Sequence, residues 1–145
     1  MLGIEDAEHE ESAPNASNLL ISKLSCSLVG VTQQVKIMPG TLVHQIYQNE
    51  EVTEAFRCNY GLNPKYRDKI SQGGFQVGGI DLDGEVRIVE LTGHRFFIAT
   101  LFLPQLSSTP ETPHPIIVAY LKAARAFKAL QQAHDLTIDC TTFTD

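Results

Sequence analysis

Positive charge is scarce in this sequence. The 145 residues hold 11 Lys and Arg against 17 Asp and Glu, which gives a formal net charge of -6 and an isoelectric point near 5.3. A nucleic-acid surface needs a clustered basic face. The only local cluster, Lys65, Arg67 and Lys69, is interpreted as the solvated side of a short helix. We therefore expect no nucleic-acid partner.

Long apolar runs and paired cysteines are missing as well. No stretch approaches the roughly 18 apolar residues of a membrane span, and the first residues are acidic, unlike the start of a secretory signal. Cys26, Cys58 and Cys140 are odd in number and form no C-x-x-C pair, which favours reduced thiols. Cys26 is interpreted as a small buried hydrophobe. These absences predict a soluble, cytoplasmic protein without a membrane partner.

The most informative stretch is Glu85 to Leu106. Residues 86–91 alternate near period two, and residues 96–102 form an apolar run between a glycine and a proline. A run this short and this apolar predicts a strand buried on both faces, in the middle of a parallel or mixed sheet. Just before it, Asp81-Leu82-Asp83-Gly84 separates two alternating runs and predicts a β-hairpin.

The other elements follow from local signals. Two strands are predicted at Leu19–Leu28, which contains Cys26, and at Gln34–Met38, and Thr41 should cap a short helix that runs through Gln48. Pro64 should begin another helix, and Pro115 a last one. The apolar stripe of the last helix is predicted to cover one face of the sheet. It consists of Ile116, Ile117, Tyr120, Leu121, Ala124, Phe127 and Leu130.

The alternation of strands and helices around a buried strand indicates a three-layer α/β domain. We expect this domain to span residues 1–135, with residues 136–145 as an edge strand or a tail. The carboxylates of Asp81, Asp83 and Glu85 alternate as in a calcium loop, but the spacing to a bidentate glutamate is missing. They are interpreted as turn residues, and we expect no metal and no cofactor.

Three segments carry a resemblance to a known family. Residues 102–105 read Phe-Leu-Pro-Gln, residues 57–60 read Arg-Cys-Asn-Tyr, and the N-terminal segment holds Leu2-Gly3, Asp6-Ala7 and Glu11. In this order they resemble the class I glutamine amidotransferase domain of CTP synthases, and more closely small stand-alone proteins related to its C-terminal region. The resemblance covers residues 1 to about 130. It implies a three-layer α/β/α, flavodoxin-like fold.

The resemblance fails at the catalytic positions. The family segment reads Phe-His-Pro-Glu, and its His and Glu complete a Cys-His-Glu triad that hydrolyses glutamine. Here Leu103 stands at the His position and Gln105 at the Glu position. Leucine has no nitrogen to accept a thiol proton, and glutamine has no charge to stabilise an imidazolium. No Gly-x-Cys-x-Gly nucleophile elbow occurs in the 145 residues. The resemblance implies either the C-terminal portion of a longer protein or a product that has lost its catalytic half.

The positions that contact substrate in the family are better kept. Glu11, or Glu10 in a shifted register, falls where the family glutamate contacts the substrate's amino group. Arg57 and Tyr60 match a segment whose arginine holds the carboxylate of glutamine, although Cys58-Asn59 replaces a His-Arg pair there. If the second arginine of the family segment is the one that binds the glutamine carboxylate, the two hydrogen bonds of its guanidinium are lost here, because Asn59 stands at that position. Arg57 then either compensates or forms an ordinary surface ion pair.

Three functions remain open. The first is a CTP-synthase-related amidotransferase-like protein with a degenerate triad, which binds a glutamine-like ligand without hydrolysing it. The second is an amide or ester hydrolase that uses an upstream cysteine with another base, such as His94. The third is a structural or regulatory protein, as a homo-oligomer or completed by a partner chain, because exposed sheet edges need cover. The resemblance implies pyrimidine nucleotide synthesis, although it includes no ATP-binding synthetase domain.

Overall fold

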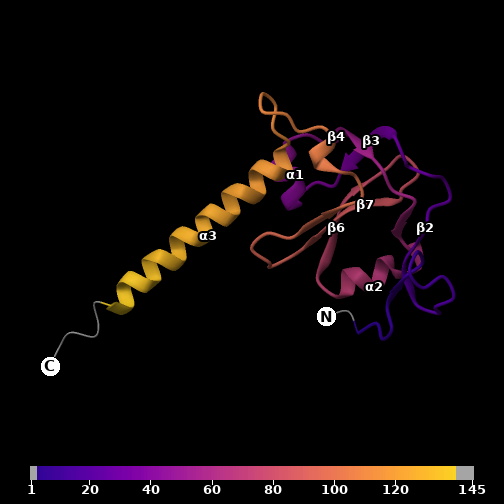
Figure 1. The fold of residues 1–145 in the computed structure, drawn as a ribbon, viewed down its shortest axis with the longest axis horizontal. Coiled ribbons are helices and arrows are strands. Elements are labelled where there is room, and N and C mark those ends of the chain that lie inside the picture. Colours follow the sequence, from indigo (N-terminus) through magenta and orange to yellow (C-terminus); the bar gives the residue numbers. More distant parts are fainter. Residues whose placement is uncertain (1–2, 140–145) are drawn as a thin grey trace.

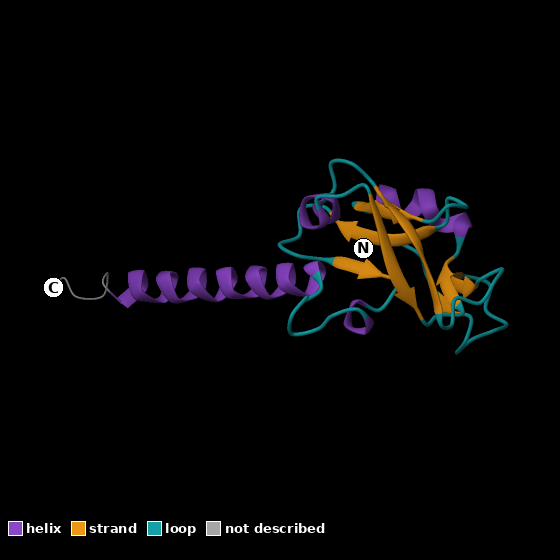
Figure 2. Ribbon diagram, turned by 90° about the horizontal axis from the view of Figure 1, so that it is seen from above, coloured by secondary structure: helices purple, strands orange, loops and turns teal. Residues whose placement is uncertain are grey.

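The computed structural model describes residues 3–139, and the side chains of residues 3–133. Two β-sheets and two short helices form a body from which one long helix extends (Figures 1 and 2). The strands are β1 Glu8–His9, β2 Leu19–Lys23, β3 Val31–Ile37, β4 Glu51–Phe56, β5 Tyr60–Leu62, β6 Phe75–Ile80, β7 Val86–Leu91 and β8 Ile98–Thr100. The helices are α1 Leu42–Tyr47, α2 Arg67–Gln72 and α3 Pro115–Asp139, with single 3-10 turns at Pro64–Tyr66 and Pro104–Leu106.

The strands form one small sheet and one larger sheet. The small sheet has the order β1-β2-β5, with β1 parallel to β2 and β2 antiparallel to β5. The larger sheet has the order β4-β3-β6-β7-β8, and every pair in it is antiparallel. The core is built on the larger sheet, and its buried residues are Leu28, Val35, Ile37, Val43, Phe56, Ile88, Phe102 and Ile116.

The predicted hairpin is confirmed. β6 and β7 pair from Phe75 opposite Leu91 to Ile80 opposite Val86. The turn is held by Asp81, whose Oδ1 accepts hydrogen bonds from the amides of Asp83 (3.0 Å) and Glu85 (2.9 Å). The Asp81 carboxylate therefore stabilises the hairpin turn by accepting hydrogen bonds from its backbone amides. Within the described residues, no group of three or more His, Cys, Asp or Glu side chains is arranged to hold a metal ion.

The predicted helix cap at Thr41 is also confirmed. Its hydroxyl accepts a hydrogen bond from the amide of His44 (3.0 Å), and α1 ends at Tyr47 with Gln48 as its C-terminal cap. A second cap comes from β7, since the buried carboxylate of Glu90 accepts from the amides of Leu42 (2.9 Å) and Val43 (3.0 Å). Sheet and helix are thus joined by hydrogen bonds to the free amides of a helix N-terminus.

The prediction of a central strand over residues 96–102 is wrong. β8 has three residues, pairs with β7 alone among the described strands, and ends the sheet order. The run is apolar for another reason, because its aromatic rings pack on three different elements. Phe96 meets Tyr120 of α3 (5.7 Å between ring centroids), Phe97 meets Phe75 of β6 (5.6 Å), and Phe102 meets Phe56 of β4 (5.8 Å).

The interpretation of Cys26 as a buried strand residue is also wrong. β2 ends at Lys23, and the side chain of Cys26 is exposed in the following loop. The second strand, β3, is confirmed and begins three residues earlier than predicted, at Val31. Pro64 opens the 3-10 turn that leads into α2, as predicted. The basic side chains of this region are all exposed.

The last helix begins at Pro115 as predicted, but its apolar stripe does not cover a sheet. Figures 1 and 2 both show α3 extending away from the body. Ile116 is buried, whereas Tyr120, Leu121 and Leu130 are 56%, 59% and 67% exposed. The helix axis points outward, so only its first turns can reach the core. α3 runs through Asp139, residues 140–145 lie outside the described residues, and the domain boundary at residue 135 stays a prediction.

Candidate functional site

A cavity of about 590 Å³ lies between the small sheet, α2 and the β7–β8 side of the larger sheet. Most of its wall is apolar. The polar or ionisable residues that line it are His9, Glu11, Arg57, Cys58, Asn59, Tyr60, Arg87 and Thr100. A volume of this size falls in the range of small-molecule sites, which are mostly apolar with a few placed polar groups.

The three predicted substrate-binding residues, Glu11, Arg57 and Tyr60, all line this cavity. They come from separate segments, since Glu11 follows β1, Arg57 follows β4 and Tyr60 begins β5. His9 joins two of these segments: its Nδ1 accepts a hydrogen bond from the amide of Glu11 (3.1 Å), and its ring lies 5.0 Å from that of Tyr60. Their role in binding stays a prediction, but their convergence makes a shared ligand possible.

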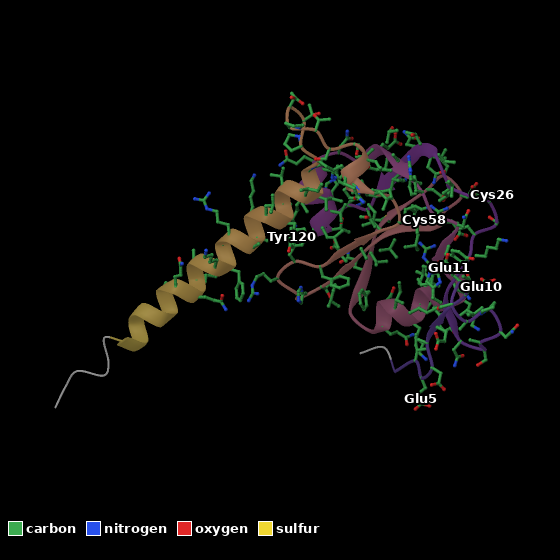
Figure 3. All side chains as sticks on the ribbon, viewed as in Figure 1. Glu5, Glu10, Glu11, Cys26, Cys58 and Tyr120 are labelled. Carbon is green, nitrogen blue, oxygen red and sulfur yellow. The ribbon has the colours of Figure 1, made fainter. Side chains whose placement is uncertain are left out.

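Glu10 does not line the cavity. Its carboxylate accepts a hydrogen bond from the amide of Lys23 (2.5 Å) and so fastens the N-terminal segment to the end of β2. Figure 3 shows Glu10, Glu11 and Cys58 on the side of the body remote from α3. Of the two neighbouring glutamates, Glu11 is therefore the one that faces the cavity.

Arg57 is exposed at the cavity, and no carboxylate of the described residues forms an ion pair with it. Next to it, the half-buried Cys58 donates its thiol hydrogen to the carbonyl of Leu101 (3.3 Å). The Arg57 guanidinium is thus available to a ligand anion, whereas the Cys58 thiol is held against the backbone.

The two degenerate triad positions, Leu103 and Gln105, do not line the cavity. Leu103 is half-buried, and its amide donates to the carbonyl of Ala55 (3.1 Å). Gln105 is exposed in the 3-10 turn that follows. His94, the alternative base, is exposed and lines a separate hollow of about 140 Å³ against α3. None of these three side chains faces the residues predicted to bind substrate.

A buried polar cluster, absent from the sequence predictions, joins β4 to the start of α3. Oε1 of Glu54 accepts hydrogen bonds from the hydroxyl of Tyr47 (2.5 Å) and from Nε2 of His114 (3.0 Å). Nδ1 of His114 accepts from the amide of Ile116 (3.2 Å), which assigns the ring proton to Nε2. Burial raises the pKa of the Tyr47 hydroxyl, and its hydrogen bond to Glu54 and the charge of that carboxylate raise it further.

A second buried pair was also missed. Arg87 and Asp81 are each 7% exposed, and Nη2 of Arg87 donates to Oδ2 of Asp81 (2.5 Å). The two residues lie six positions apart across the hairpin turn. A period-two pattern with polar residues at alternate positions predicts that such side chains face water, so the sequence offered no signal that Arg87 points inward.

Comparisons with known proteins support the resemblance. No protein-family model matches the chain. A CTP synthase of Sulfurisphaera tokodaii is 35% identical over an alignment of 133 residues, which covers 86% of this chain and 25% of that protein. A CTP synthase of Nostoc punctiforme is 34% identical over 134 residues, again 25% of its length. The chain thus spans about a quarter of the curated relatives it matches.

Solved structures show the same fold. The glutaminase domain of Trypanosoma brucei CTP synthase, solved with bound acivicin, superimposes with a TM-score of 0.81 at 24% identity over 87% of this chain and 53% of that domain. A GMP synthase component from Thermoplasma acidophilum matches with a TM-score of 0.59 at 14% identity. Among the described residues, no helix is both long and apolar enough to cross a membrane. The chain is therefore homologous to a segment of the CTP synthases, and it has the class I glutamine amidotransferase fold of their glutaminase domain.

Proposed function

We propose that this chain is a ligand-binding module of the CTP-synthase glutaminase type that does not hydrolyse glutamine. The observation that carries the proposal is the convergence of Glu11, Arg57 and Tyr60 on one cavity. Hydrolysis needs a base beside a nucleophile, and Leu103 and Gln105 supply neither a base nor a charge to orient one.

The charges at the cavity fit the two ends of an amino acid. Glu11 is exposed beside the cavity, and its carboxylate can accept hydrogen bonds from an ammonium group. The guanidinium of Arg57 can donate hydrogen bonds to a carboxylate. Tyr60 adds a hydroxyl and a ring held by His9. A solved domain of the same fold carries bound acivicin, which supports a small-molecule site here. We assign this role to the cytoplasm and to pyrimidine nucleotide synthesis as part of the proposal.

Titration calorimetry with L-glutamine tests this function. Arg57→Gln removes a charge-assisted hydrogen bond and should weaken glutamine binding about tenfold or more. Arg67→Gln is the matched control, because Arg67 is exposed and does not line the cavity. No measurable heat with glutamine, or equal effects of the two variants, would contradict the binding role. Ammonia release by the 145-residue chain would contradict the loss of hydrolysis.

A second function, completion of the fold by a partner, is favoured by a separate observation. β8 ends its sheet, α3 leaves Leu121 and Leu130 exposed, and the chain covers 53% of the solved glutaminase domain. We propose that a polypeptide with the remainder of that fold pairs along β8, since an open edge strand is a template for pairing. Sedimentation velocity tests this proposal: the isolated chain should associate, and a well-dispersed monomer would contradict it.

A further inference from the structure

The wall of the cavity carries a guanidinium that the proposed glutamine-like site does not use. Arg87 of β7 lines the cavity but is only 7% exposed. Its Nη2 donates to Asp81, while its Nε is buried with no hydrogen-bond acceptor among the described residues. A buried donor without an acceptor destabilises the fold, and native structures seldom leave one unexplained. A ligand that brings an acceptor to this guanidinium would explain why it is kept.

Asp81 does not accept a hydrogen bond from this Nε. Its Oδ1 already accepts from the amides of Asp83 and Glu85 in the hairpin turn, and its Oδ2 accepts from Arg87. These bonds fix the carboxylate and, through it, the guanidinium. Arg87 is therefore preorganised before any ligand arrives, which reduces the entropy lost on binding.

The rest of the wall is apolar and larger than a polar amino acid needs. Side chains from five elements contribute to it: Leu20, Ile21, Leu62, Ile70, Phe75 and Val89. A cavity of about 590 Å³ with such a lining gains most from a ligand that removes apolar surface from water. The unpaired Nε–H of the Arg87 guanidinium lies on this apolar wall, and a charged donor binds an anionic acceptor most strongly, so the wall calls for an anionic group attached to an apolar body.

We propose that Arg87 and this apolar wall form a subsite for an amphipathic carboxylate, a straight-chain carboxylic acid of medium length. The carboxylate accepts hydrogen bonds from Arg87, and the alkyl chain lies against the wall. This subsite uses none of the residues that carry the proposed glutamine-like binding. An experiment can therefore contradict one of the two binding proposals without contradicting the other.

Titration calorimetry of the 145-residue chain with hexanoate, octanoate and 1-octanol tests the subsite. Each added methylene should tighten binding about fourfold, since its burial contributes about 0.8 kcal/mol, so octanoate should bind about 15-fold more tightly than hexanoate. 1-Octanol, which has the same chain without the anion, should bind at least about tenfold more weakly than octanoate. Equal binding of octanoate and 1-octanol would overturn the role of Arg87, and no binding of either would overturn the subsite.

Variants locate the anion. Arg87→Gln should weaken octanoate binding about tenfold or more and leave 1-octanol unchanged. Arg67→Gln is the matched control, because Arg67 donates to the carbonyl of Gly84 in the same hairpin turn (3.1 Å) without lining the cavity. Octanoate binding that is lost in Arg57→Gln and kept in Arg87→Gln would overturn the assignment. If Arg87→Gln does not fold, the difference in affinity between octanoate and 1-octanol for the unmodified chain still tests whether the site binds an anion.

Discussion

Tyr47 gives the buried cluster a measurable pH dependence. Its hydroxyl donates to the Glu54 carboxylate (2.5 Å), and burial, this hydrogen bond and the charge of Glu54 all raise its pKa in the folded chain. In the unfolded chain the pKa of tyrosine is about 10. Above that pH the unfolded state releases a proton that the folded state keeps. The free energy of unfolding therefore falls as the pH rises.

The slope follows from one proton per molecule. It approaches about 1.36 kcal/mol per pH unit well above pH 10, and the loss between pH 10 and 11 is about 1 kcal/mol. Tyr47→Phe removes this contribution together with a hydrogen bond to a charged acceptor. At pH 7 it should therefore lower the free energy of unfolding by about 1.5–3 kcal/mol. The gap between the two proteins should then shrink by about 1 kcal/mol from pH 10 to 11.

Urea unfolding followed by circular dichroism at 222 nm measures both numbers, and the chain contains no tryptophan for a fluorescence assay. All other titrating groups are shared by the two proteins, so their effects cancel in the difference. Tyr120→Phe is the matched control, because Tyr120 is 56% exposed on α3. A gap between wild type and Tyr47→Phe that stays constant from pH 8 to 11 would refute the burial of Tyr47 against Glu54.

Three further outcomes are expected. Glu90→Ala leaves two amides of α1 without their acceptor and should cost about 3 kcal/mol or more, whereas Glu90→Gln keeps one acceptor and should cost about half of that; urea midpoints distinguish them. Gly79→Ala places a Cβ 2.8 Å from Cδ1 of Ile88, so overpacking should cost about 1–3 kcal/mol, read as a lower melting temperature. Iodoacetamide should modify the exposed Cys26 before the half-buried Cys58, in a time course read by peptide mass spectrometry; the reverse order would contradict the burial of Cys58.

Local signals in the sequence predicted local structure. Asp-Gly at the hairpin tip, the cap at Thr41 and the helix start at Pro115 were confirmed, because each depends on backbone geometry within a few residues. The run 96–102 and the exposure of Cys26 were predicted wrongly. Both depend on which distant element packs against a segment, and an apolar run reads the same whether its partners form one sheet or three separate contacts.

In the candidate site too, contacts between distant segments could not be predicted from the residues alone. Glu11, Arg57 and Tyr60 could be singled out only through the family resemblance, and the structure shows that they line one cavity. The hydrogen bond between Glu54 and His114 joins residues 60 positions apart, and a single sequence holds no trace of such a pair. Arg87 lies between two apolar residues of a strand with a period-two pattern, and that pattern predicts a side chain that faces water. The pairing of buried polar side chains was thus the feature that the sequence predicted least, and only the structure reveals it.

Because α3 extends away from the body (Figure 1), a small change in its tilt moves its far end by a larger distance. Its 25 residues, at a rise of 1.5 Å each, give a rod of about 37 Å. The first half of the helix is held by His114 just before it, by the contact between Phe96 and Tyr120, and by Arg95, whose guanidinium carbon lies 3.6 Å from the ring centroid of Phe127. The part of α3 beyond Phe127, which ends at Asp139, is about 18 Å long. A tilt of about 10° at Phe127 would therefore move the end of the helix by about 3 Å. Small rearrangements of these side chains would thus produce a larger displacement at the end of α3.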